Sequence, residues 1–212
     1  MIKRSHKQNC SLAFAADILS ERWTLLIVRE LLLKPCRYGQ LMNNLAGMGT
    51  NLLAARLKEL SALKLIEKSS NYYQLADLGK ALEPAVLNLI RWGFNFSNSL
   101  SDPDYLHRPE WDLLAMKALF NSKASVNLAV CMKVTLNSDS NEHNPDQSNQ
   151  EAWIYLNQGL FQFGFDQPPA SIDIHWREGL AELAKPNPEN LLENPKESNA
   201  LKDFLSAFDP IS

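Results

Sequence analysis

The residues with the most informative chemistry lie on one predicted helix, residues 50–63. Leucines recur along it at spacings of four and three, so they share one face and should be buried. They are Leu53, Leu57 and Leu60. The opposite face carries Asn51, Ala55 and Lys58. An asparagine amide can pair with an adenine edge and a lysine suits phosphate or guanine, so this face fits DNA. The alternative is an amphipathic helix whose polar face is simply solvated.

The elements around this helix predict a winged helix-turn-helix. A short helix over residues 38–45 precedes it, and the link 46–49 separates the two helices. Two strand-like runs, 65–68 and 72–75, follow as a hairpin. In this fold the second helix enters the DNA major groove, and its first turn, here Thr50 and Asn51, points at base edges. A basic Arg37 at the start of the first helix could reach a phosphate.

The hairpin tip is the second place where DNA contact is expected. Lys68 and Asn71 flank the tip, which in a winged helix lies along the DNA backbone or in the minor groove. Because the tip carries only one cation, a merely solvated turn explains it equally well.

Several motifs in this region together resemble one known family. They are Cys10-Ser11, Glu21-Arg22-Trp23-Thr24-Leu25-Leu26-Ile27, Arg37-Tyr38, Gly47-Met48-Gly49-Thr50-Asn51-Leu52-Leu53, Arg56-Leu57-Lys58-Glu59-Leu60 and Leu82-Glu83-Pro84. Over about residues 9–93 the chain resembles the HxlR-type winged-helix transcriptional regulators of bacteria. One position departs from the family pattern, because Lys64 stands where a glycine usually precedes the closing Leu-Val/Ile. We therefore expect a weakened helix C-cap there.

The resemblance implies a symmetric dimer formed through the terminal helix of this domain. We expect that helix over residues 77–96, with an apolar stripe along it. The stripe residues expected at the interface are Leu82, Leu89 and Trp92. A palindromic operator would match the symmetry of such a dimer.

Composition limits the function classes further. The 212-residue chain is 45% hydrophobic and 21% charged, as in ordinary soluble proteins. Three cysteines and no apparent export signal predict reduced thiols in the cytoplasm. Residues 1–100 hold 13 basic and 7 acidic residues, a formal charge of +6, whereas residues 101–212 hold 8 and 17, a charge of −9. This asymmetry predicts one DNA-facing domain, residues 1–98, and a second domain, residues 109–212, that does not face DNA.

The second domain is predicted to be α+β, with an antiparallel meander sheet. A short helix near residues 111–119 precedes strand runs at 126–136, 152–157, 160–165 and 171–177, and helices are expected at 178–184 and 199–208. This order is similar to that of sterol-carrier-protein-like domains, which hold an apolar cavity. The aromatic residues placed to line such a cavity are Phe161, Phe163, Phe165 and Trp176. The alternative is that these rings fill an ordinary core.

Reactive chemistry is expected at one residue, Cys10. In the resembling family a cysteine just before the first helix acts as a thiol sensor in some members. Ser11 is the expected N-cap of the first helix, and this helix N-terminus and Lys7 would both lower the pKa of the Cys10 thiol. The alternative is a small, partly buried apolar residue. No histidine has a metal-ligand spacing and no phosphate-binding loop is visible, so we expect neither an enzyme nor a cofactor.

Taken together, the sequence predicts a cytoplasmic transcriptional regulator that binds double-stranded DNA as a homodimer. The second domain would bind a small apolar effector or tune assembly. Two other classes remain open: a redox switch centred on Cys10 with a structural second domain, and a scaffold that binds apolar ligands.

Overall fold

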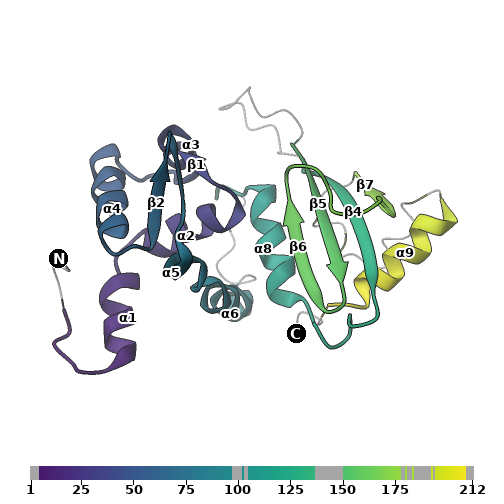
Figure 1. The fold of residues 1–212 in the computed structure, drawn as a ribbon, viewed down its shortest axis with the longest axis horizontal. Coiled ribbons are helices and arrows are strands. Elements are labelled where there is room, and N and C mark those ends of the chain that lie inside the picture. Colours follow the sequence, from purple (N-terminus) through teal and green to yellow (C-terminus); the bar gives the residue numbers. More distant parts are fainter. Residues whose placement is uncertain are drawn as a thin grey trace. The chain divides into compact units, whose positions relative to one another are not determined.

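The computed structural model describes residues 5–96, 102, 105–136, 150–177, 180, 183, 192 and 194–208. The chain divides into two compact units, Met1–Val86 and Leu87–Ser212 (Figure 1). The division falls inside one helix, whose second half belongs to the second unit: there Arg91 Nη2 donates to the Ala118 carbonyl oxygen at 2.7 Å. The functional division into residues 1–98 and 109–212 stays a prediction.

The first unit is a winged helix-turn-helix, as predicted. In chain order it contains α1 (Ser11–Leu19), α2 (Thr24–Leu33), β1 (Cys36–Arg37), α3 (Tyr38–Asn44), α4 (Thr50–Ala62), β2 (Ile66–Ser69), β3 (Tyr72–Leu75), α5 (Asp77–Lys80) and the start of α6 (Glu83–Gly93). The strands form an antiparallel sheet in the order β1-β3-β2. The two-residue β1 was not predicted, because two residues are too few to show a strand period.

A buried carboxylate joins α2 to α3. Glu30, only 2% exposed, accepts a hydrogen bond from Asn44 Nδ2 at 2.8 Å. Its other oxygen accepts from Arg29 Nε at 3.0 Å and from Nη2 at 2.8 Å. A buried charge is tolerated only with such partners, so this network fixes how the first helix of the helix-turn-helix sits on the core.

The prediction of one long helix over residues 77–96 is wrong. The chain forms α5, a turn, α6 and a 3-10 turn (η1, Phe94–Phe96) instead. Pro84 explains the break, because proline has no N–H to donate to the carbonyl of Lys80 and its ring collides with that carbonyl in a continuous helix. Pro84 is tolerated in the first turn of α6, where N–H groups have no partner within the helix.

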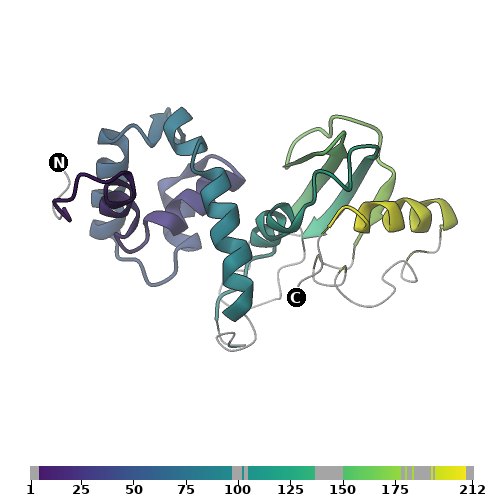
Figure 2. The same cartoon turned by 90° about the horizontal axis from the view of Figure 1, so that it is seen from below.

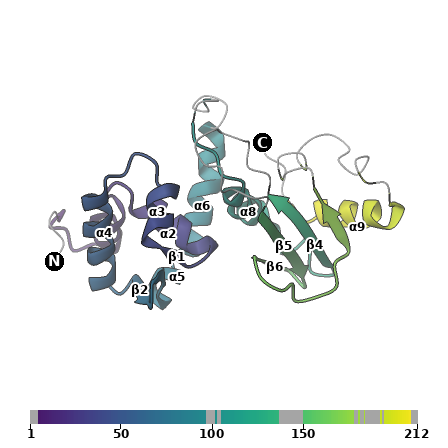
Figure 3. The same cartoon turned by 90° about the horizontal axis from the view of Figure 1, so that it is seen from above.

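The second unit is α+β, as predicted, with helices on one face of a four-stranded sheet. Its elements are the end of α6, η1, α8 (Pro109–Leu119), β4 (Ala129–Leu136), β5 (Gln150–Asn157), β6 (Leu160–Gly164), β7 (Ile174–Trp176) and α9 (Pro195–Leu205). Figures 2 and 3 show α8 and α9 on the same side of the sheet. The expected helix 178–184 lies mostly outside the described residues.

The sheet order is β6-β5-β4-β7, which corrects one part of the prediction. Strands β4, β5 and β6 form the expected antiparallel meander. The fourth strand, however, does not extend it beyond β6. It pairs in parallel with β4, with Met132 opposite Ile174 and Val134 opposite Trp176. Strand β4 is buried on both faces near Cys131, so flanking it with two strands satisfies backbone groups that would otherwise be left unpaired.

One face of this sheet supplies the core of the second unit. Alternate residues of all four strands point to that face and are buried or half-buried. They are Val130, Met132, Val134, Leu136, Ala152, Ile154, Leu156, Phe161, Phe163, Ile174 and Trp176. Leu113 and Leu114 of α8 and Leu201 and Phe204 of α9 are fully buried as well. The start of β4 at Ala129 rather than at Val126 reflects the turn before it, where the Asn121 side chain accepts the N–H groups of Lys123 and Ala124.

The C-cap of α4 leads to the first prediction. Lys64 takes the left-handed conformation, with φ of 57°, that a glycine adopts without steric cost. The cap forms nevertheless, since Leu65 N–H donates to the Leu60 carbonyl at 3.0 Å. We expect Lys64→Gly to raise the free energy of unfolding by about 0.5–1 kcal/mol, because relief of the left-handed penalty exceeds the entropy gained by the unfolded chain.

Chemical denaturation of the whole protein, followed by circular dichroism, would measure this change. The matched control is Lys58→Gly in the middle of the same helix, which should lower stability by about 1 kcal/mol. A loss of stability in both variants would show that Lys64 is not strained.

Candidate DNA-contacting surface

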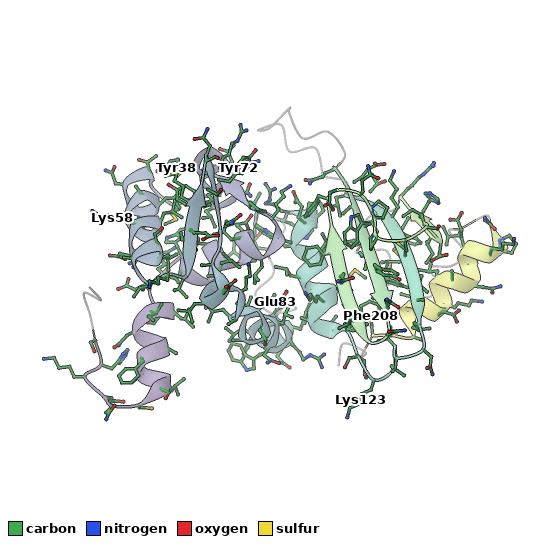
Figure 4. All side chains as sticks on the ribbon, viewed as in Figure 1. Tyr38, Lys58, Tyr72, Glu83, Lys123 and Phe208 are labelled. Carbon is green, nitrogen blue, oxygen red and sulfur yellow. The ribbon has the colours of Figure 1, made fainter. Side chains whose placement is uncertain are left out.

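The exposed face of α4 is the centre of the candidate site. Leu53, Leu57 and Leu60 are buried, as predicted, with exposures of 0%, 2% and 2%. Thr50, Asn51, Ala55 and Lys58 are exposed. Lys58 lies on the outward side of α4 in Figure 4. The periodicity of the sequence therefore identified the buried and the solvent-facing sides of this helix correctly.

The start of α4 is held in place by α3. The Tyr38 hydroxyl donates to the Thr50 carbonyl oxygen at 2.8 Å. At the start of α3, Arg37 N–H donates to the Gln40 side-chain oxygen at 2.8 Å, which caps that helix. These bonds fix the angle between α3 and α4, so the first turn of α4, which contains Asn51, has a defined orientation.

The sheet brings a second group of side chains together. Arg37 on β1 is paired with Tyr72 on β3, and its guanidinium lies 4.9 Å from the centre of the Tyr72 ring. Lys68 on β2 lies 5.5 Å from the centre of the Tyr73 ring. Asn71 is exposed, next to Ser70, whose φ of 53° closes the hairpin turn. Figure 4 shows Tyr38 and Tyr72 near the tip of this unit.

Tyr72 is exposed beside Arg37, but the sequence reasoning did not include it among the candidate site residues. A signal was available, because an aromatic residue directly after a turn on a short strand has little core to enter. Its partner could not have been inferred, since β1 was not recognised. Arg37 and the hairpin, far apart in the sequence, therefore form one surface through the pairing of β1 with β3.

The residues expected at a dimer interface are apolar and largely exposed in the single chain. Leu82 is half-buried, Leu89 is 46% exposed and Trp92 is 62% exposed. The Trp92 ring packs edge-on against Phe96, with ring centres 4.8 Å apart. A group of neighbouring exposed apolar side chains is typical of an interaction surface, and the dimer interface itself stays a prediction.

Cys10 is exposed and directly precedes α1. Cys10 is the N-cap of this helix, which corrects the expectation that Ser11 is the cap, since Ser11 is the first helical residue. The pKa of the Cys10 thiol is lowered by the backbone N–H groups of Ala13 and Leu12, which stabilise a thiolate. The helix terminus, rather than Lys7, supplies the effect. The other two cysteines, Cys36 and Cys131, are buried, and burial raises the pKa of Cys131.

The aromatic residues of the second unit contact one another. Phe161 is buried and lies edge-on to Phe120, Phe163 and Phe208, with ring centres 5.5, 6.4 and 6.1 Å apart. Trp176 is 1% exposed, whereas Phe163 and Phe165 are half-buried. Each of the buried rings is thus part of the packed core, and their role in holding a ligand stays a prediction.

Comparison with known proteins identifies the family of this chain. Residues 18–101 match the model of the HxlR-like helix-turn-helix family. The chain is 32% identical over 99 residues to the HTH-type transcriptional regulator YvaP of Bacillus subtilis, covering 43% of this chain and 88% of that protein. This chain belongs to the HxlR-like helix-turn-helix family.

Further proteins are similar to part of this chain. The chain is 35% identical over 107 residues to the HTH-type transcriptional regulator MT3179 of Mycobacterium tuberculosis, covering 47% of this chain and 61% of that protein. It therefore spans about three fifths of the length of this mycobacterial relative. A solved structure, the quinone-bound YodB from B. subtilis, is 28% identical, with a TM-score of 0.39, covering 40% of this chain and 97% of that chain.

The HxlR-like family and these relatives are transcriptional regulators, not enzymes. Within the described residues, no helix combines the length and apolarity needed to cross a membrane. No group of three or more histidine, cysteine or acidic side chains in that part of the chain is arranged to hold a metal ion. The matched family region ends at residue 101, so the sterol-carrier-like interpretation of the second unit stays a prediction.

The thiol environment leads to the second prediction. In the folded protein at neutral pH, Cys10 should react with a thiol-specific disulfide reagent in a fast phase, because it is exposed and its pKa is lowered. Cys36 and Cys131 should react only when the chain opens. Stopped-flow absorbance would show one fast thiol, and Cys10→Ser should remove that phase. A fast phase that persists in Cys10→Ser and disappears in Cys36→Ser would contradict the assignment.

Proposed function

We propose that this HxlR-like protein is a DNA-binding transcriptional regulator that reads its operator with α4. The observation that carries the proposal is the orientation of this helix. Its leucine face is buried and its Asn51, Ala55 and Lys58 face is exposed next to a wing. Asn51 would pair with a base edge, Lys58 would contact phosphate or guanine, and Ala55 would allow close approach to the groove.

The wing and β1 would hold the protein on the DNA backbone. Arg37 and Lys68 are exposed cations on the same small sheet, and Asn71 extends the surface at the hairpin tip. Phosphate contacts of this kind fix position and orientation but carry no sequence information. The excess of basic residues in the first hundred positions favours the approach of a polyanion.

A homodimer is the second part of the proposal. Leu89 and Trp92 form an exposed apolar strip with Phe96, which a second copy would cover. Leu82 would extend the interface at the start of α6. A two-fold dimer of this kind would read a palindromic operator in the cytoplasm.

The second domain, residues 109–212 by our proposal, would tune this activity. It is acidic overall and would not bind DNA directly. A small apolar effector would have to displace contacts among Phe161, Phe163 and Phe165, or enlarge the space beside Trp176. We propose this role for the sheet face under α8 and α9, because it holds the largest aromatic cluster among the described residues.

A redox switch at Cys10 is the alternative function. The exposure of the thiol and the two amides that lower its pKa support it. Oxidation or alkylation at the N-cap would add bulk and change charge at the start of α1. In this alternative the second domain is structural.

Base reading by α4 gives the third prediction. Asn51→Ala should weaken binding to an operator selected from random DNA by about 1–3 kcal/mol, the effect of one good base contact, with little change on unrelated DNA. Lys58→Ala should weaken both and reduce the slope of log K against log salt by about one unit. Fluorescence anisotropy at several salt concentrations would measure both quantities.

The matched control is Lys123→Ala, which removes an exposed lysine from the second unit (Figure 4). It should leave both the affinity and the salt slope unchanged. Equal losses of Asn51→Ala on operator and unrelated DNA would assign Asn51 to the phosphate contacts, and an unchanged operator affinity would exclude α4 as the reading helix.

The interface gives the fourth prediction. Trp92→Glu should convert the dimer to monomers, because a charge buried without a partner is costly. Sedimentation velocity would measure the change. Leu160→Glu is the matched control, because Leu160 is as exposed as Trp92 but lies on β6. A dimer that survives Trp92→Glu and dissociates in the control would place the interface on the sheet of the second unit.

A further inference from the structure

A cavity of about 140 Å³ lies in the first unit, between α1, the turn before α2 and the inner side of α4. Asn51 and Lys58 do not line it, but Ala55, on the same face of α4, does. Its lining comes from α1, the turn before α2, Thr24 at the start of α2, and α4, so its shape depends on how these elements pack. A volume of this order accommodates one small ring, since a cavity of about 150 Å³ holds benzene.

The polar part of the lining is acidic. Asp17, Glu21 and Glu59 contribute three carboxylates and Arg56 one guanidinium. Arg56 donates to Glu59 at 2.7 Å and also to Glu21, so its charge is already shared between two carboxylates. Three anions and one cation leave an excess of two negative charges on the lining.

Asp17 holds its charge in a buried position. It is only 7% exposed, and it accepts a hydrogen bond from His6 N–H at 2.8 Å and contacts the His6 ring. These bonds lower the pKa of Asp17, so the carboxylate stays ionised near neutral pH. A partly buried negative charge attracts a cation more strongly than an exposed one, since screening by water is weaker.

The rest of the lining is apolar except for Thr24, and it includes Ala55. The walls are formed by Ile18 from α1, by Leu52 and Leu60 from α4, and by Leu63, the residue after α4. An apolar wall with a few convergent charges is the usual make-up of a small-molecule site. An inorganic cation would gain nothing from these walls, and an organic anion would be repelled by the carboxylates.

We propose that this cavity binds a small organic ammonium ion that carries one ring or a short alkyl chain. The ammonium group donates to Glu59, Glu21 or Asp17, and the apolar part lies against the leucines of α4. Leu52 lies next to Asn51 in the sequence, so an occupied cavity would bias the position of the reading helix. Binding itself does not depend on the proposed function, whereas an effector role rests on it.

The test uses the full-length protein and benzylammonium as the probe, with benzyl alcohol and benzoate as neutral and anionic probes of similar size. Isothermal titration calorimetry should show saturable binding of benzylammonium alone. Methyl NMR of Ile and Leu side chains should show shifts at Ile18, Leu52, Leu60 and Leu63. Leu160 and Leu201, in the second unit, should not shift.

Glu59→Gln is an isosteric change at a half-exposed position. It should weaken the binding of benzylammonium by about tenfold, as expected for the loss of one charge-assisted hydrogen bond. The matched control Glu67→Gln, on exposed β2, should leave it unchanged. Melting curves of both variants would establish that they are folded. The absence of saturable binding, equal binding of benzoate, or shifts confined to the second unit would overturn the proposal. Because DNA is absent from these measurements, they succeed or fail independently of the regulator assignment.

Discussion

Burial of the leucine face of α4 is the constraint on which the first unit depends. Leu53, Leu57 and Leu60 are almost completely removed from water. Each contributes about 1.5–3 kcal/mol when buried, so rotating the helix to expose them would cost more than any single polar contact returns. The orientation of the polar face is therefore set by the core. The Tyr38 hydrogen bond to Thr50 adds only the final positioning of the first turn.

The same core decides which cations can meet a polyanion. Arg29 is committed to the buried Glu30, and Arg56 to Glu21 and Glu59, so these guanidinium groups stabilise the fold. The exposed cations of α4 and the small sheet, Lys58 and Arg37 among them, remain turned to solvent. Net charge alone would count all of these residues together. The structure separates the cations that form internal ion pairs from those that face solvent, and only the latter make one side of the unit positively charged.

The sequence by itself determined the features that depend on local repetition. A helical period assigned the two faces of α4, and alternation assigned the three strands of the meander. The lowered pKa of the Cys10 thiol is also a local property. It arises from the amide groups at the N-terminus of α1, which lower the pKa wherever that helix packs. Pro84 was a local signal for the break between α5 and α6, but the prediction followed the apolar stripe across it and gave one helix, which the structure corrects. These properties involve residues within a few positions of one another.

Only the tertiary structure decided which distant segments meet. β1 is defined by its pairing with β3, which brings Arg37 to Tyr72, and β7 joins β4 rather than β6. The cavity likewise exists only because the tertiary fold brings Asp17 of α1 and Glu59 of α4 to one lining. Such pairings are settled by competition among possible partners for burial and backbone hydrogen bonds. No local period records the outcome of that competition, because it depends on the free energy of the whole unit.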